Sequence, residues 1–267
     1  MSRGYAARAA VTAERGPDGR TRLARLRSDG PLALRAAADA VYLVGAAAGP
    51  LGGDRLDLEL RVGAGARLAV RSAACSLALP GDGPSRSSVR AEVGAGGHLD
   101  VAPEPVVAAG GCDHRSAASV ALAAGATLRW RDELVLGRHG EQPGRHSGRL
   151  DVTVGGAPLL RHELRLDDPD VHLSSAVLDG AGAVGSVLLV GEDLTAEPHT
   201  GDGLSVLPLA VPQAHHVRAV LITATAEHSA ELRRRLVQGE RMAQSALAGT
   251  DRPAPEPTAV PGTAYRT

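Results

Sequence analysis

A short pattern recurs four times in the first part of this chain, each time around a glycine. A run with apolar residues at every second position meets a turn of small residues, and a second such run follows. Residues 62–70, 93–101 and 122–130 are clear copies, and residues 154–160 form a weaker fourth. The central glycines lie 31, 29 and 31 residues apart; they are Gly65, Gly96, Gly125 and Gly156. A fixed period of this length predicts stacked β units, each burying its apolar face against its neighbours.

Each copy is interpreted as a β-hairpin. Leu56, Leu58 and Leu60 alternate with Asp57 and Glu59, which is the period-two pattern of a strand with one wet face. The glycine supplies the positive φ that a tight turn requires. We therefore predict a mainly β fold, in which stacked β-hairpins form a β-superhelix, a solenoid-like single domain with one or two helices near the C-terminus. An ordinary β-sandwich with evenly spaced hairpins is the alternative.

The predicted domain spans residues 1–248. Residues 226–247 carry the one strong helical pattern, with three consecutive arginines opposite an apolar face. Four residues make up that face: Leu232, Leu236, Met242 and Leu247. The helix either packs on the protein's own sheet or docks a partner. Residues 249–267 contain four prolines and are predicted to be a disordered tail.

Composition narrows the classes of function. The chain has 29 basic and 30 acidic residues and a net charge of −1, so its charge gives no reason to expect a nucleic-acid or anionic-membrane partner. No uncharged apolar run approaches the roughly 18 residues of a transmembrane helix. The first residues carry no apolar stretch of the signal-peptide type, so a cytoplasmic protein is expected. With only one Trp, three Tyr and no Phe, the core must be built of Leu, Val and Ala.

Four segments follow one another in an order that is found in a known family. They are Gly-Pro-Leu-Gly-Gly-Asp at 49–54, Val-Gly-Ala-Gly-Ala at 62–66, Leu-Asp-Val-Ala-Pro-Glu-Pro at 99–105, and Asp-Glu-Leu-Val-Leu-Gly-Arg at 132–138 with Glu141. In order and spacing they resemble the urease accessory proteins called UreD in some organisms and UreH in others. The resemblance covers roughly residues 30–190. The chain departs from the family pattern at residues 71–76, where Cys75 lies in place of a threonine-rich stretch.

The resemblance implies a β-superhelical fold and a role in urease maturation without catalysis. Such a protein acts as a scaffold that binds apo-urease, recruits the accessory protein UreF and the GTPase UreG, and assists nickel delivery to the urease active site. The implied partners are therefore the urease structural subunits, UreF and UreG. The resemblance implies no tightly bound cofactor. Ni²⁺ would be in transit, through an internal water-filled passage proposed for the family.

Two acidic residues have competing interpretations. Asp54 follows two glycines, but a phosphate loop is impossible because the chain has no lysine. Asp54 is interpreted as capping backbone N–H groups at a turn or, by resemblance, as a polar position near the passage or an interface. Glu104 lies between Pro103 and Pro105, which hold the backbone extended. It is either a solvent-exposed residue or a weak oxygen ligand for passing Ni²⁺.

A second acidic pair lies on a predicted strand. Strict alternation places Trp130 and Asp132 on one face of that strand and Glu133 on the other. An acidic side chain that faces inward requires a partner, and Arg138 is the candidate. By resemblance, Glu133, Arg138 and Glu141 line or organise the passage.

Cysteines and histidines offer the remaining candidates. Cys112 and His114 suggest a catalytic pair, but residues at i and i+2 rarely form one, so a surface loop is expected first, transient metal contact second and catalysis third. Cys75 and Cys112 are expected to be free thiols. Cys75, Cys112 and His114 are the candidates for transient metal contact, and no firm metal site is predicted. The other histidines lack zinc-hydrolase spacing and are expected at the surface; they include His139, His146, His162, His172, His215 and His216.

Two other functions stay open. One is a hydrolase that uses Cys112 and His114, or the carboxylates of Asp132 and Glu133. The other is a β-solenoid binding module for another partner, although the scarcity of aromatic residues argues against a sugar ligand. The urease maturation scaffold is the leading hypothesis, because the family segments occur in order and no coherent catalytic constellation accompanies them.

Overall fold

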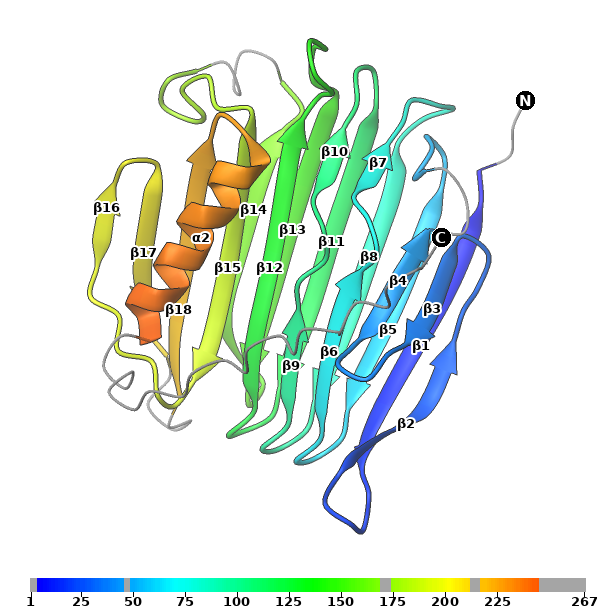
Figure 1. The fold of residues 1–267 in the computed structure, drawn as a ribbon, viewed down its shortest axis with the longest axis vertical. Coiled ribbons are helices and arrows are strands. Elements are labelled where there is room, and N and C mark those ends of the chain that lie inside the picture. The colour runs from blue at the N-terminus through cyan, green and yellow to red at the C-terminus, as the bar shows by residue number, and fades with distance from the viewer. Residues whose placement is uncertain (1–3, 46–48, 169–173, 212–216, 245–267) are drawn as a thin grey trace, which may run out of the picture.

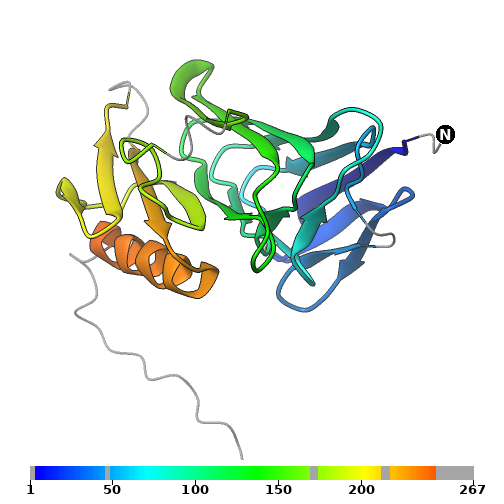
Figure 2. The same ribbon diagram turned by 90° about the horizontal axis from the view of Figure 1, so that it is seen from above.

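The structure is a computed structural model that describes residues 4–45, 49–168, 174–211 and 217–244. Its strands form two sheets that lie face to face, with one helix on the outside of the second sheet (Figure 1, Figure 2). The predicted tail at 249–267 lies outside the described residues, as do His172, His215, His216 and Leu247.

The first sheet contains seven strands, most of which are parallel. Its members are β1 (Ala6–Arg15), β2 (Thr21–Arg27), β5 (Arg55–Val62), β8 (Ser85–Val93), β11 (Asp113–Leu122), β13 (Arg145–Val154) and β14 (Ala157–Leu166). Their order in the sheet is β14-β13-β11-β8-β5-β1-β2. The five inner strands run parallel, and β2 and β14 pair antiparallel at the two ends.

The second sheet changes from parallel to antiparallel along its width. Its members are β3 (Leu32–Ala36), β4 (Val41–Gly45), β6 (Arg67–Ser72), β9 (His98–Val101), β12 (Thr127–Leu136), β15 (Ala183–Gly191), β16 (His199–Gly201), β17 (Leu204–Leu209) and β18 (Arg218–Ala226). From β4 to β12 the pairing is parallel, and from β12 through β15, β18 and β17 to β16 it is antiparallel. Two short strands, β7 (Ser76–Ala78) and β10 (Val106–Ala108), extend the sheet beside β12.

Three of the four glycine turns connect the two sheets. Around Gly65 the chain leaves β5, which pairs with β8, and enters β6, which pairs with β9. The turns around Gly96 and Gly125 do the same one and two repeats later. The amide of Gly65 donates a 2.9 Å hydrogen bond to the carbonyl of Ala95, so each turn stacks on the next.

The predicted stacked, solenoid-like β fold is confirmed, but the predicted hairpins are wrong at these three turns. Apolar alternation is the same whether a strand pairs with its chain neighbour or with the strand one repeat later. Of the four copies, the one around Gly156 does form a hairpin, which joins β13 to β14.

The core near the glycine turns is mainly aliphatic and buried. Leu60, Val70 and Leu99 are fully buried, and Leu128 is nearly so. These side chains come from both sheets and belong to one continuous cluster, in which Trp130 is the aromatic member. Burying each leucine contributes about 1.5–3 kcal/mol, so the repeat is held together by many small side chains.

Helix α2 (Ser229–Gln244) packs on the protein's own second sheet, over β15, β17 and β18 (Figure 1). Leu232, Leu236 and Ala243 are fully buried there. Gly239 permits the close approach, because a Cβ added at this position would lie 2.5 Å from Ile222 Cγ2. The packing interpretation of this helix is thus confirmed, whereas partner docking stays a prediction.

Candidate functional site

A cavity of about 510 Å³ opens between the two sheets, away from the glycine turns. Strands β8, β11, β13 and β14 supply one wall, and strands β12, β15, β16, β17 and β18 supply the other. The exposed residues Val177, Thr200 and Asp202 line the cavity where it reaches the surface. The solenoid therefore has a packed half and a hollow half within the same pair of sheets.

A continuous row of oxygen-bearing side chains crosses the wall formed by the second sheet. Its members pair in register from β12 to β16, and they are Asp132, Ser186, Thr223, Ser205 and Thr200. Directly paired residues of an antiparallel sheet point to the same face, and all five line the cavity. Asp202 follows in the turn after β16, so a carboxylate lies near each end of a row of hydroxyl groups.

Asp132 is the inner end of this row. Its Oδ2 accepts a 2.7 Å hydrogen bond from Trp130 Nε1, which fixes the carboxylate on the cavity side of β12. Asp132 is exposed to the open space of the cavity, while the protein atoms of the two cavity walls bury its carboxylate from bulk water. This burial raises the pKa of Asp132 to about 6, against the smaller opposing effect of the Trp130 hydrogen bond. Asp132 thus changes its charge close to neutral pH.

The facing wall carries buried imidazoles. His114 and His146 lie side by side on β11 and β13, with ring centroids 5.6 Å apart. His114 Nδ1 shares a 2.9 Å hydrogen bond with Ser85 Oγ, whereas His146 Nδ1 is buried without a hydrogen-bond partner. Burial lowers the pKa of His114 to about 4 and that of His146 to about 3. Both rings are therefore neutral at physiological pH, and His146 lines the cavity.

These histidines correct two predictions. His114 lies in a strand and is 2% exposed, so the surface loop predicted for Cys112 to His114 is wrong. His146 is buried and His162 is half-buried and lines the cavity, so surface positions were wrong for them as well. His139 is exposed in the loop after β12, as expected.

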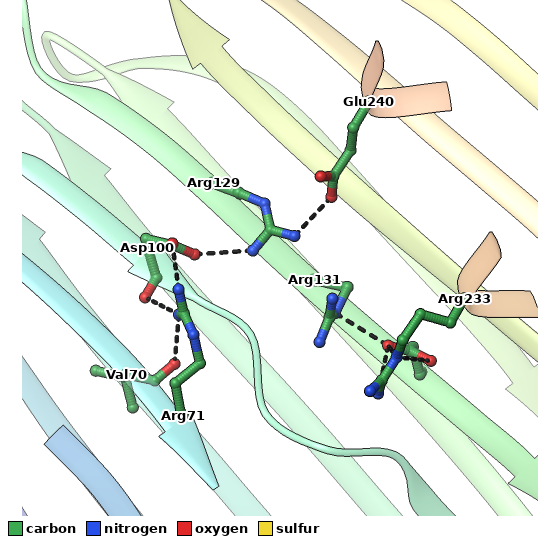
Figure 3. Close-up of polar contacts among 8 residues, drawn as sticks. Val70, Arg71, Asp100, Arg129, Arg131, Arg233 and Glu240 are labelled. Atoms are coloured by element: carbon green, nitrogen blue, oxygen red, sulfur yellow. Dashed lines mark hydrogen bonds and ion pairs between the residues drawn. The ribbon is translucent and has the colours of Figure 1, made fainter. Parts of the chain in front are cut away.

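Glu133 is among the residues that border the cavity, but its carboxylate is bound by arginines on the side of β12 that faces α2. Its carboxylate lies 3.0 Å from both Arg131 Nε and Arg233 Nη2, and its side chain is fully buried. Arg233, which is labelled in Figure 3, also contacts Glu104, whose carboxylate lies 3.1 Å from Arg233 Nη1. The structure thus brings the predicted residues Glu104 and Glu133 together through an arginine of α2. Glu104 is half-buried and ion-paired rather than simply solvent-exposed.

A second ionic group lies beside the first on the same face. Asp100 forms ion pairs with both Arg71 and Arg129. Arg129 also forms an ion pair with Glu240 of α2, with 2.8 Å between Arg129 Nη2 and Glu240 Oε1 (Figure 3). The two arginines hold the pKa of Asp100 below its usual range, although burial opposes them. Two charge-balanced groups therefore attach the polar side of α2 to β9 and β12.

Arg138 and Glu141 form their own pair at the surface. Arg138 Nη2 lies 2.7 Å from Glu141 Oε1, and the contact is bidentate. Hydrogen bonds from Arg138 and from the Gly110 amide lower the pKa of Glu141 to about 2. The predicted pairing of Arg138 with an acidic residue of β12 is thus wrong, because Asp132 bonds to Trp130 and Glu133 bonds to two other arginines. Neither Arg138 nor Glu141 lines the cavity.

Asp54 serves the backbone around its turn. Its carboxylate accepts hydrogen bonds from the amides of Tyr5 and Leu51, at 2.7 and 2.9 Å. The capping interpretation is therefore confirmed. Asp54 is 3% exposed and does not line the cavity.

Both cysteines are free thiols, as predicted. Cys75 is exposed, while Cys112 is buried in a small apolar cluster with Ala108 and Leu134. Burial raises the pKa of the Cys112 thiol, and Cys112 Sγ donates a 3.8 Å hydrogen bond to the Arg145 carbonyl. A protonated, buried thiol is a poor nucleophile, so the geometry gives no support to a Cys-His hydrolase.

Sequence reasoning missed most of the cavity wall. The Ser85 and His114 contact was detectable, because 29 residues separate them and this is one period of the repeat. The contact between Arg233 and Glu133 could not be predicted in this way, because the two residues lie 100 positions apart and Arg233 is outside the repeat. Ser186, Thr223 and Ser205 lie in the antiparallel strands beyond the repeat, where no period indicates the register.

The fold and the cavity define a class of protein: a solenoid-like β protein with an open cavity between its sheets, whose mostly apolar wall is crossed by a row of oxygen-bearing side chains. Within the described residues, no group of three or more His, Cys, Asp and Glu side chains is placed to hold a metal ion. In that same part of the chain, no helix has the length and apolar character needed to span a membrane.

Comparison with known proteins makes the assignment specific. The family model described as UreD urease accessory protein matches residues 5–259. The chain is 42% identical to Urease accessory protein UreD of Frankia casuarinae, with 87% of this chain and 88% of the relative covered. It is 40% identical to the protein of that name from Streptomyces avermitilis, with 86% and 94% covered. The chain belongs to the UreD family of urease accessory proteins, and the family resemblance read from the sequence is confirmed.

Proposed function

We propose that this protein is a non-catalytic scaffold in urease maturation and that Ni²⁺ passes through its inter-sheet cavity. Family membership supports the role in maturation. In this proposal the chain binds apo-urease together with the accessory proteins UreF and UreG in the cytoplasm, and nickel is its cargo. The observation that carries the passage is the in-register row from Thr200 to Asp132.

The chemistry of the row suits a hydrated divalent cation in transit. Hydroxyl and carboxylate oxygens bind such ions more weakly than thiolates do, and conduction requires binding weak enough for release. Asp202 at the surface and Asp132 at the inner end supply negative charge at both ends of the row. On the facing wall, the unpartnered Nδ1 of His146 offers a nitrogen ligand, a type that nickel accepts.

The test is reconstitution of urease with its host's structural subunits, UreF, UreG and nickel. We expect urea hydrolysis to be lost without this chain and to fall strongly with Asp132→Ala or Ser186→Leu. Ser119→Leu is the matched control, because Ser119 is exposed on β11. Capture of apo-urease by each variant should be unchanged, which separates passage from docking.

Two results would contradict the proposal. Full activity and full nickel loading of urease without this chain would contradict the proposed scaffold role. If both cavity variants capture apo-urease normally and still give full nickel loading, the proposed passage is contradicted, whereas the scaffold role is not.

A further inference from the structure

Strand β2 is the open edge of the first sheet. It pairs with β1 on one side, and no other strand of the described residues pairs with its other side (Figure 1). All seven of its residues, Thr21 to Arg27, are exposed. An edge of this kind presents unpaired backbone N–H and C=O groups, which is a template for pairing with another strand.

The two faces of β2 differ in chemistry. Leu26 and Leu23 pair in register with Val11 and Ala13 of β1, which are buried, so both leucines belong to the core face. Ala24 is the extra residue of a β-bulge between Arg25 and Leu23. The bulge leaves Leu23 and Leu26 on the same face although they are three residues apart. Leu26 is nevertheless 39% exposed and Leu23 is 37% exposed. The solenoid core thus ends at β2 without a complete cover.

The opposite face of β2 is basic. Arg22, Arg25 and Arg27 lie there, in register with Glu14, Thr12 and Ala10 of β1. Arg22 forms an ion pair with Glu14 at 3.4 Å. Within the part of the chain that the structure describes, Arg25 and Arg27 form no ion pair with an acidic side chain. Two uncompensated cations therefore flank the open backbone edge.

We propose that β2 is a docking edge for an extended segment of a partner protein in which acidic and apolar residues alternate. The segment adds to the sheet as a further strand by main-chain hydrogen bonds. Its apolar residues cover Leu23 and Leu26, and its carboxylates face Arg25 and Arg27. This surface is separate from the cavity, so the proposal does not depend on nickel passage.

Charge decides between this partner and a second copy of the chain. Edge-to-edge pairing of two β2 strands would bring the arginines of one copy against those of the other. Like charges opposite each other destabilise a sheet pair, whereas opposite charges stabilise it. An acidic segment removes this repulsion and completes the sheet.

The experiment uses the full chain and a fluorescein-labelled nine-residue peptide in which glutamate alternates with valine, read by fluorescence anisotropy. We expect saturable binding that weakens at least tenfold in the double variant Arg25→Glu, Arg27→Glu. The matched control is Arg86→Glu, Arg90→Glu, which makes the same charge change at exposed positions of the inner strand β8. It should bind like the original chain, and a lysine–valine peptide should prefer the β2 variant.

A second variant guards against a general charge effect. Leu26→Ser leaves the charge unchanged and should also weaken binding, with the melting temperature confirming that each variant folds. No binding by the original chain, or equal binding by the β2 variant and the β8 control, would overturn the proposal. Dimerisation in sedimentation that β2 substitutions abolish would overturn it too, because the occupant would then be a second copy.

Discussion

The packed and hollow halves of the inter-sheet space are built from the same strands. Toward the glycine turns, β12 contributes Leu128 to a buried, mainly aliphatic cluster, and further along it contributes Asp132 to the cavity. On β8 the change runs from Val93 in the core to Ser87 in the cavity wall. The backbone geometry continues through both halves. A solenoid can therefore hold a core or a cavity, and the size and polarity of its inward side chains decide which.

Truncation of a large side chain should separate the two halves most clearly. Leu99 is fully buried in the packed half, so Leu99→Ala should lower the free energy of unfolding by about 2–5 kcal/mol. Leu164 lines the cavity, so its side chain already borders empty space. Leu164→Ala should therefore lower the free energy of unfolding clearly less than Leu99→Ala does. Urea denaturation of both variants measures the difference. Equal losses would show that the cavity wall is packed as tightly as the core.

Acid should destabilise the hollow half through its histidines. The folded pKa values of His114 and His146 lie below the unfolded value of 6.5, so the unfolded chain takes up protons first as pH falls. Stability should therefore fall from pH 6.5 downward, by roughly 2 kcal/mol per histidine at pH 5. His146→Leu should remove the part of this acid destabilisation that His146 causes. The difference between the urea midpoints at pH 7 and pH 5 should then be smaller than in the original chain. His139→Leu, at an exposed loop position, is the control and should leave that difference unchanged.

Enlargement of a small side chain should give opposite results in the two halves. Ala91 is 1% exposed among packed side chains, so Ala91→Leu should cost about 1–3 kcal/mol through overpacking. Ser186→Leu adds a similar volume beside the cavity and should leave stability nearly unchanged. Thermal unfolding compares the two. A large loss in the Ser186 variant would mean that the cavity has no room for the added atoms.

The smallest expected effect is the pH response of Asp132, because the residue is exposed to the cavity, where solvent screens its charge. Its folded pKa of about 6 lies above the unfolded value of 3.8, so the contribution to stability is fully present below pH 3.8 and is lost as pH rises through 6. Asp132→Asn should therefore gain stability relative to the original chain as pH increases from 4 to 7. This direction is opposite to that of the histidines. An NMR titration in which the Asp132 carboxyl changes its charge near pH 4 would contradict it.

Sequence reasoning recovered the repeat and its strands, because alternation and glycine spacing are local signals. It did not recover the pairing, since β5 shows the same pattern whether it pairs with β6 or with β8. It placed Asp132 and Glu133 on opposite faces correctly, because alternation is a property of one strand. Their distant partners could not be predicted from the chain alone: Arg233, one of the two arginines that pair with Glu133, comes from α2. The hydroxyl row that leads to Asp132 depends on antiparallel register across four later strands.

Trp130 gives the protein a built-in optical reporter. It is the only tryptophan of the chain and is almost fully buried, and its indole N–H donates to the carboxylate that lines the cavity. Because indole emission responds to a nearby charge and is quenched by paramagnetic ions, the fluorescence of the unlabelled protein arises from one known point beside Asp132. Loss or gain of a proton there, or arrival of the Ni²⁺ that we propose as cargo, can then be followed in real time without attaching a dye.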